Sequence, residues 1–199
     1  MNKVKYLLTY RYAEIIHDLT VKFTRRFILS SLSSLSNLRT LSGGERKPDY
    51  RTADQMNQAA RSGKQNIVEA ISKDIVSSQG VLKLLGVSKA SFEELISDYE
   101  DFLRQRQFQL WPKSDPRVAE LKKIGYRLSD LRNLSDLGEL KEKPELFGEP
   151  EKDANFLLTL CHIESFLLDK QIKATEDKFI KQGGYSERLA RKRREFRGF

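Results

Sequence analysis

TADQMNQAARSGKQNIVEAI, residues 52–71, carries apolar and small side chains at steps of three and four residues. This spacing predicts a helix that buries one face. The predicted inner face consists of Met56, Ala60, Gly63, Ile67 and Ile71. Thr52 followed by Gln55 resembles a capping box, which places the helix start at Thr52. Since Ala59, Ala60, Ser62 and Gly63 are small, a neighbouring helix can approach closely.

Three further segments carry apolar stripes with helical spacing. Residues 4–30 predict a first helix, with Tyr12, Ile16, Leu19, Phe23 and Phe27 on one face. Residues 76–106 predict a third helix, with a stripe of Val81, Leu85, Phe92, Leu95, Tyr99 and Phe102. Residues 151–181 predict a fourth, with Leu157, Cys161, Leu168, Ile172 and Phe179. Glu164 falls inside this last stripe and interrupts its apolar pattern. It is interpreted either as a buried ion-pair partner or as the mark of a patch that water reaches.

The pattern favours an all-α fold, an antiparallel up-down four-helix bundle over residues 1–182. Residues 31–50 and 110–150 are predicted connectors, the second a long irregular insertion before the fourth helix. Within it, Ser114 or Asp115 caps a short helix near Pro116 to Ile124. Residues 183–199 form a basic C-terminal tail with room for a short helix.

Both connectors contain leucine at every third position. The first run is Leu32, Leu35, Leu38 and Leu41, and the second is Leu128, Leu131, Leu134, Leu137 and Leu140. A strict three-residue period drifts around an α-helix, so these leucines do not hold one face. The two runs either pack together or are sequence expansions with little role, and the second interpretation is favoured.

Positive charge is concentrated at the two ends of the chain. The net charge is +8, from 36 Lys and Arg against 28 Asp and Glu. Residues 1–30 hold six cations against two carboxylates, and residues 185–199 do the same, so each end carries +4. Clustered positive charge favours a polyanionic partner, with nucleic acid ahead of a membrane. The alternative is that the charge serves solubility and the tail is incidental.

The candidate nucleic-acid-binding residues are the clustered cations, because Lys and Arg bind phosphates by Coulomb attraction and Arg also by paired hydrogen bonds. They are Lys22, Arg25, Arg26, Arg61, Lys64, Arg104, Arg106, Arg188, Arg191, Lys192, Arg193, Arg194 and Arg197. Tyr185, Phe196 and Phe199 are candidates for stacking on bases.

No catalytic residue, metal site or cofactor is predicted. His17 and His162 lack further ligands at helical spacing, and Cys161 is interpreted as a buried structural thiol. The acidic run from Glu93 to Asp101 is interpreted as a solvated face or a source of salt bridges, including bridges between subunits. A single cysteine excludes an internal disulfide. We find neither a signal peptide nor a membrane-spanning run, so a cytoplasmic location is expected.

Several of these motifs resemble a known family. Asp54-Gln55-Met56, Ala59-Ala60-Arg61-Ser62 and Asn66-Ile67-Val68-Glu69-Ala70 resemble the signature of the four-helix-bundle proteins encoded in intervening sequences of bacterial large-subunit ribosomal RNA genes. That family includes Avd, the accessory variability determinant of diversity-generating retroelements. Family members usually carry glycine where Ala70 stands. Residues 81–106 resemble the family's third helix, including Ala90, Ser91, Glu93, Glu94 and Leu95.

The C-terminal part resembles a subgroup with a suffix region. Its marks are Asn155, Leu158, Leu167-Leu168-Asp169, Gln171, Glu176, Phe179 and Gly183-Gly184. The resemblance covers nearly the whole chain except residues 31–48 and 126–150. It implies an all-helical fold without known catalysis. The Avd branch forms ring-like homopentamers with a basic surface, binds RNA and a reverse transcriptase, and supports mutagenic complementary-DNA synthesis.

The expected function is therefore a non-catalytic, RNA-binding, homo-oligomeric accessory or scaffold protein, with a reverse transcriptase as a candidate partner. The alternative is an adaptor that docks a partner protein through its helices. A nuclease is disfavoured, since only the acidic run on the third helix offers metal ligands.

Overall fold

The computed structural model describes residues 3–30, 48–73 and 78–198. In these ranges the chain is all-helical, and residues 134 and 140 form the only β-type pairing, an isolated bridge. The α-helices are α1 (Leu8–Phe23), α2 (Tyr50–Lys73), α3 (Ser78–Gln105), α4 (Pro116–Ser129), α5 (Pro150–Gln182) and α6 (Tyr185–Arg197). Two 3₁₀ turns, Lys3–Tyr6 and Leu131–Asn133, and a π-helical segment, Thr24–Leu29, complete the described elements.

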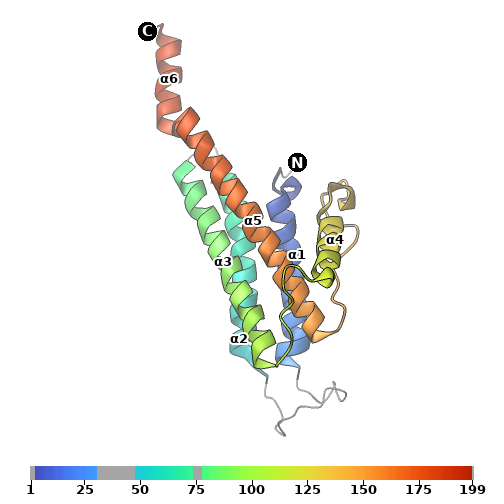
Figure 1. Cartoon of the computed structure of the whole chain (residues 1–199). Helices are drawn as coiled ribbons and strands as arrows, with labels where there is room; N and C mark the ends of the chain where they lie inside the picture. Colours follow the sequence, from blue (N-terminus) through green and yellow to red (C-terminus); the bar gives the residue numbers. More distant parts are fainter. Residues whose placement is uncertain (1–2, 31–47, 74–77, 199) are drawn as a thin grey trace.

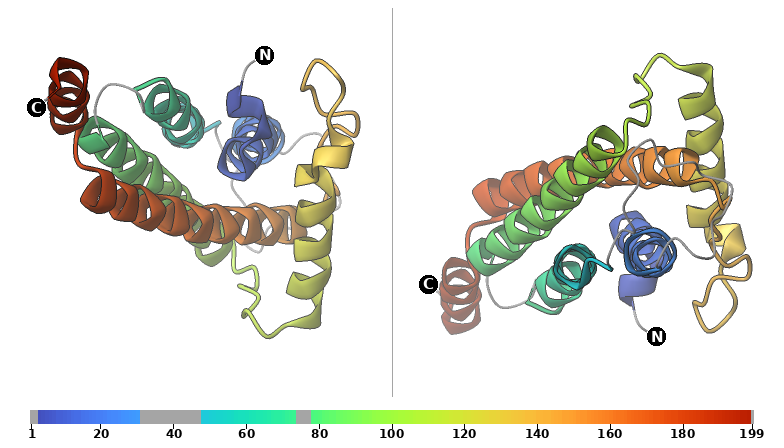
Figure 2. Two further views of the ribbon diagram at one scale, coloured as in Figure 1. Left: turned by 90° about the horizontal axis from the view of Figure 1, so that it is seen from above. Right: turned by 90° about the horizontal axis from the view of Figure 1, so that it is seen from below.

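Helices α1, α2, α3 and α5 lie side by side and form what we call the helical body (Figure 1). Helix α2 packs against α3, α3 against α5, and α1 against both α2 and α5. The chain direction alternates from each of these helices to the next (Figure 1). Helix α4 lies outside, against α1 and α5, and α6 leaves the body at the end where α5 finishes (Figure 2).

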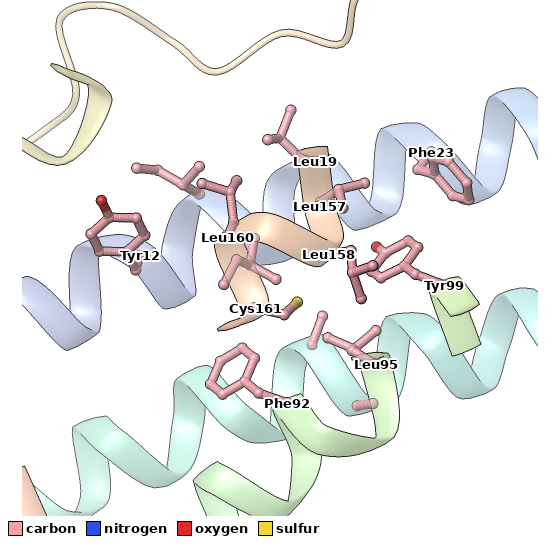
Figure 3. Packing of buried hydrophobic residues seen from close by; sticks show 14 of the residues in the cluster. Tyr12, Leu19, Phe23, Phe92, Leu95, Tyr99, Leu157, Leu158, Leu160 and Cys161 are labelled. Atoms are coloured by element: carbon pink, nitrogen blue, oxygen red, sulfur yellow. The ribbon is translucent and has the colours of Figure 1, made fainter. Parts of the chain in front are cut away.

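The core of the body is apolar and aromatic (Figure 3). The Phe23 ring lies edge-on to three others, at centroid distances of 5.1 Å from Phe27, 5.3 Å from Tyr99 and 4.8 Å from Phe102. The Tyr99 hydroxyl lies 2.9 Å from the hydroxyl of Thr20, so this buried polar group has a partner. The stripes predicted for the first and third helices are buried, which confirms their periodicity.

Helices α2 and α3 approach closely at Gly63. A Cβ atom on Gly63 would lie 2.6 Å from the ring of Phe92, and the hydroxyl of Ser88 donates a 2.8 Å hydrogen bond to the Gly63 carbonyl. Ala60 beside it is fully buried. The prediction that small residues on this helix admit a close neighbour is therefore confirmed.

Several predicted boundaries and caps are wrong. The capping box at Thr52 and Gln55 is not formed, because α2 begins at Tyr50 and Asp49 accepts hydrogen bonds from the Thr52 backbone N (3.0 Å) and hydroxyl (2.7 Å). The first predicted helix divides into a 3₁₀ turn, α1 and a π-helical segment. The cap of α4 is Asp115, one of the two predicted residues, and its side chain accepts a hydrogen bond from Arg117 N. The predicted end is wrong, because α4 continues beyond Ile124 to Ser129.

The second leucine run has no single environment. Leu128 and Leu134 are buried, whereas Leu131 is 54% and Leu137 80% exposed. Leu128 belongs to α4, Leu131 lies in the 3₁₀ turn that follows, and the other three leucines lie in the loop after that turn. The first run, Leu32 to Leu41, and the nearby Gly43 and Gly44 lie outside the described residues.

Both interpretations offered for Glu164 are wrong. The residue is fully buried, so it marks no wet patch. Neither carboxylate oxygen has a hydrogen-bond partner among the described protein atoms, and no ion pair reaches it there. Burial raises the pKa of Glu164 well above its usual value.

Candidate nucleic-acid interface

The most basic element is α6, which a glycine pair separates from α5. Gly183 adopts a left-handed φ of 71°, and a Cβ there would collide with the Glu187 carboxylate. That carboxylate accepts a 2.7 Å hydrogen bond from the backbone N of Gly184, which caps the first turn of α6. Gly198, with φ of 75°, ends the helix in the usual left-handed cap. The predicted tail is thus a helix with defined ends.

Helix α6 carries six cations and only two carboxylates, Glu187 and Glu195. Its residues from Ala190 onward are exposed in the described part of the chain, and Phe196 is 93% exposed. No ion pair involving these cations is formed with any described residue. At 3.6 residues per turn the cations surround the helix instead of lining one side. The side chain of Tyr185 and all of Phe199 lie outside the described atoms.

The basic residues near the N-terminus are mostly engaged in internal contacts. Lys22 donates to the Pro144 carbonyl (2.8 Å) and pairs with Glu145 at 2.6 Å. Arg11, counted in the N-terminal +4, is buried and donates to the Ser129 carbonyl at 2.6 Å. Arg26 lies over the Phe27 ring at 5.6 Å and against Gly148. Most cations at this end therefore contact other residues of the chain, and Arg25 and Arg26 are exposed.

The other candidates are spread over the body. Arg106 donates to the Phe27 carbonyl at 2.6 Å and stacks on Phe102 at 4.1 Å. Arg104 pairs with Asp101 at 2.7 Å. On α2, Lys64 Nζ lies 3.2 Å from His17 Nδ1, and Arg61 is exposed.

The structure does not bring the thirteen candidates together. The last turns of α1 and α3 lie at the end of the body opposite α6 (Figure 1). Six of the candidates gather on α6, and the others divide between the far end of the body and α2.

The acidic run on α3 supplies ion pairs and one region of repulsion. Lys89 pairs with Asp169 at 2.7 Å and with Glu93 at 3.5 Å, which ties α3 to α5. Burial, with Glu94 and Asp101 nearby, raises the pKa of Asp98. No group of three or more His, Cys, Asp or Glu side chains able to hold a metal ion occurs among the described residues. Cys161 is buried, which raises its thiol pKa.

The structure also contains a groove that the sequence analysis misses. It lies between α4, α5 and the segment after α3, has a volume of about 480 Å³, and includes Trp111, Tyr126 and Phe166. Its residues come from three separated segments, so no local sequence motif marks it. Asn155, Leu158 and His162 stand out in the sequence for other reasons, the first two as marks of the family resemblance and His162 as a histidine without further metal ligands.

Comparison with protein-family models, curated proteins and solved structures found no match to this chain. The family resemblance therefore stays a prediction. None of the helices in the described ranges combines the length and the apolar character that crossing a membrane requires.

Proposed function

We propose that this protein is a non-catalytic RNA-binding accessory protein whose principal RNA contact is α6. The observation that carries the proposal is a helix of net charge +4 that projects from the body with five of its six cations exposed (Figure 1). Phosphate contacts dominate the affinity of proteins for nucleic acids, and arginine is suited to them because its guanidinium forms paired hydrogen bonds. The exposed ring of Phe196 adds a surface on which an unpaired base can stack.

In this proposal the helical body is an antiparallel up-down four-helix bundle that presents α6. Residues 110–150 are the insertion before its fourth helix, and α4 belongs to that insertion. Self-association into a homo-oligomer, which the resemblance implies is a pentamer, multiplies the number of α6 helices that one RNA meets. Avidity then converts weak phosphate contacts into useful affinity. The resemblance extends the proposal to a reverse transcriptase partner in a diversity-generating retroelement.

The direct test compares two variants of equal net charge. The first neutralises α6 through Arg191→Gln, Lys192→Gln, Arg193→Gln and Arg194→Gln. The second neutralises four exposed cations of the body and the insertion, through Arg51→Gln, Lys83→Gln, Lys143→Gln and Lys173→Gln. Each variant carries +8 − 4 = +4. We expect the first to lose most of its affinity for a labelled structured RNA, measured by fluorescence anisotropy, and the second to retain it.

Equal losses in the two variants would mean that net charge alone governs binding, and would contradict the role given to α6. The adaptor alternative makes a different prediction for a chain that lacks residues 185–199. Under that alternative the truncated protein still captures its partner protein, and RNA binding has no bearing on capture.

A further inference from the structure

The groove beside α4, which we call the α4–α5 groove, is built on a fixed wall. Trp111 donates from its backbone N to Asn155 Oδ1 and from Nε1 to Glu151 Oε1, both at 2.9 Å. The guanidinium of Arg117 covers the indole at 3.9 Å from the ring centroid. Asn155 is buried and also donates to the Gln109 carbonyl at 2.9 Å. The segment that bears Trp111 is therefore anchored to α5 before any ligand arrives.

Large apolar side chains of the groove remain open to solvent. Tyr126 on α4 is 57% exposed, Phe166 on α5 is 58% exposed, and Leu110 is 49% exposed. A cluster of exposed apolar side chains around one concavity marks a binding surface more often than scattered ones do. The volume of about 480 Å³ lies in the range of small-ligand sites, roughly 300–1,000 Å³.

The charge of the groove is positive. Lys113 and Lys122 line it with one carboxylate, Glu100. Just outside, the Lys170 ammonium lies 4.9 Å from the centroid of the Phe166 ring. His162 in the same groove is half-buried, and its pKa is lowered by burial and by Lys113, with a smaller contribution from Lys122 and an opposing one from Glu100. A neutral imidazole offers one hydrogen-bond donor and one acceptor.

We propose that the α4–α5 groove binds a single unpaired nucleotide of RNA, with the base against Tyr126 and Phe166 and the phosphate at Lys113 and Lys122. A purely apolar ligand would leave the lysines without a role, and a simple anion would leave the aromatic surfaces exposed. Aromatic side chains stack on unpaired bases, which base-paired RNA does not offer. The groove thus adds selection for unpaired RNA, whereas α6 supplies contacts with phosphates.

This inference rests on the proposed function only for the source of the nucleotide. Trp111 is the single tryptophan of the chain and lines both this groove and a neighbouring hollow beside Arg117 and Phe147, so its fluorescence reports binding at either. Loss of the signal in variants of Tyr126 and Phe166, which line the α4–α5 groove alone, assigns the binding to that groove. The probes are adenosine monophosphate, ribose 5-phosphate, a short single-stranded RNA and the same RNA as a duplex. We expect saturable quenching by the mononucleotide and the single strand, and little by ribose 5-phosphate or the duplex.

Tyr126→Ala and Phe166→Ala remove the proposed stacking surfaces without emptying the core, because both side chains are more than half exposed. Each is expected to weaken nucleotide binding by about 5- to 150-fold, the usual effect of losing a base–aromatic stack. Leu137→Ala, which changes an exposed side chain outside the groove, is the matched control and should bind like the parent. Circular dichroism confirms that the variants fold.

The outcomes separate the two proposals. If RNA binds by anisotropy but neither RNA nor mononucleotide changes Trp111 fluorescence, the groove inference is overturned and the role of α6 stands. If the mononucleotide binds and RNA does not bind at all, the proposed RNA function fails while the nucleotide chemistry of the groove is supported. If RNA binds at α6 and only the free mononucleotide quenches Trp111, the RNA source is overturned and a free nucleotide is the ligand.

Discussion

At the residue scale, Glu164 is the side chain most at odds with its surroundings. It lies on α5, in the buried core of the helical body, and its carboxylate has no hydrogen-bond partner among the described atoms. Burial raises its pKa. A carboxyl group that is protonated when folded binds more protons in the native than in the unfolded state. The free energy of unfolding therefore falls as pH rises from about 4.3, the ordinary Glu pKa, towards the raised folded pKa.

The slope of that decrease is at most about 1.4 kcal/mol per pH unit. We expect Glu164→Gln to remove it, and Glu164→Leu to stabilise the protein at pH 7 by about 1–3 kcal/mol because an unsatisfied polar group is lost. Urea unfolding between pH 5 and 8 measures both effects. Glu176→Gln, on an exposed part of α5, is the control and should leave the slope unchanged. An unaltered slope in Glu164→Gln would show that another group titrates.

Gly63 and Gly86 provide a matched pair of helical glycines. Gly63→Ala would place its Cβ 2.6 Å from the buried Phe92 ring, whereas no described atom outside the local helix backbone lies within 4 Å of a Cβ at Gly86. We expect Gly63→Ala to destabilise the fold by about 1–3 kcal/mol through overpacking. Gly86→Ala should stabilise it by about 0.5–1 kcal/mol, since alanine is the better helix former. Thermal unfolding of the two variants measures both changes in stability. Stabilisation by Gly63→Ala would refute the close approach of α2 and α3.

At the scale of the elements, periodicity in the sequence predicts the long helices well because each of them buries a stripe. It fails at their ends. Thr52 looks like a cap in sequence, yet Asp49 accepts the hydrogen bonds that start α2. The C-terminal part of α4 is missed because Leu128 also begins the three-residue leucine run. In the structure Leu128 continues the buried stripe of Val118 and Leu121.

The candidate nucleic-acid interface likewise has features that the sequence predicts and features that only the fold creates. The charge on α6 is visible in sequence because its six cations fall within ten residues, four of them consecutive from Arg191 to Arg194. The engagement of Lys22 and Arg106 is not visible, because their partners, Glu145 and the Phe27 carbonyl, are remote in sequence. The α4–α5 groove is hidden for the same reason, since Lys113, Tyr126 and Phe166 meet only through the packing of α4 on α5.

Helix α6 should be much less stable than the body. Isolated helices of fewer than about 12–15 residues are marginal in water, and α6 has 13 residues, most of them exposed. We expect its amides to exchange with deuterium rapidly, whereas those in the buried first half of α5 exchange slowly. Adding RNA should protect α6. Slow exchange in α6 of the free protein would show that it packs against another surface, such as a second copy of the chain.

At the scale of the whole molecule, α6 projects from one end of the body, away from the last turns of α1 and α3 (Figure 1). One copy therefore offers RNA a short basic helix, and several copies offer a larger surface. We expect the purified protein to have a solution mass that is a multiple of 23.1 kDa, measured by analytical ultracentrifugation. A monomer at all concentrations would remove avidity from the mechanism and leave RNA binding to a single α6.

The central claim is that RNA binds through phosphate contacts on α6, and its most direct test is the salt dependence of RNA affinity. Each phosphate contact contributes about −0.7 to −0.9 to the slope of log K against log salt concentration. If all six cations of α6 make contact, one helix contributes a slope of about −4 to −5. Deleting residues 185–199 should remove most of that dependence, while a flat curve for the full chain, or equal slopes for both proteins, would contradict the account.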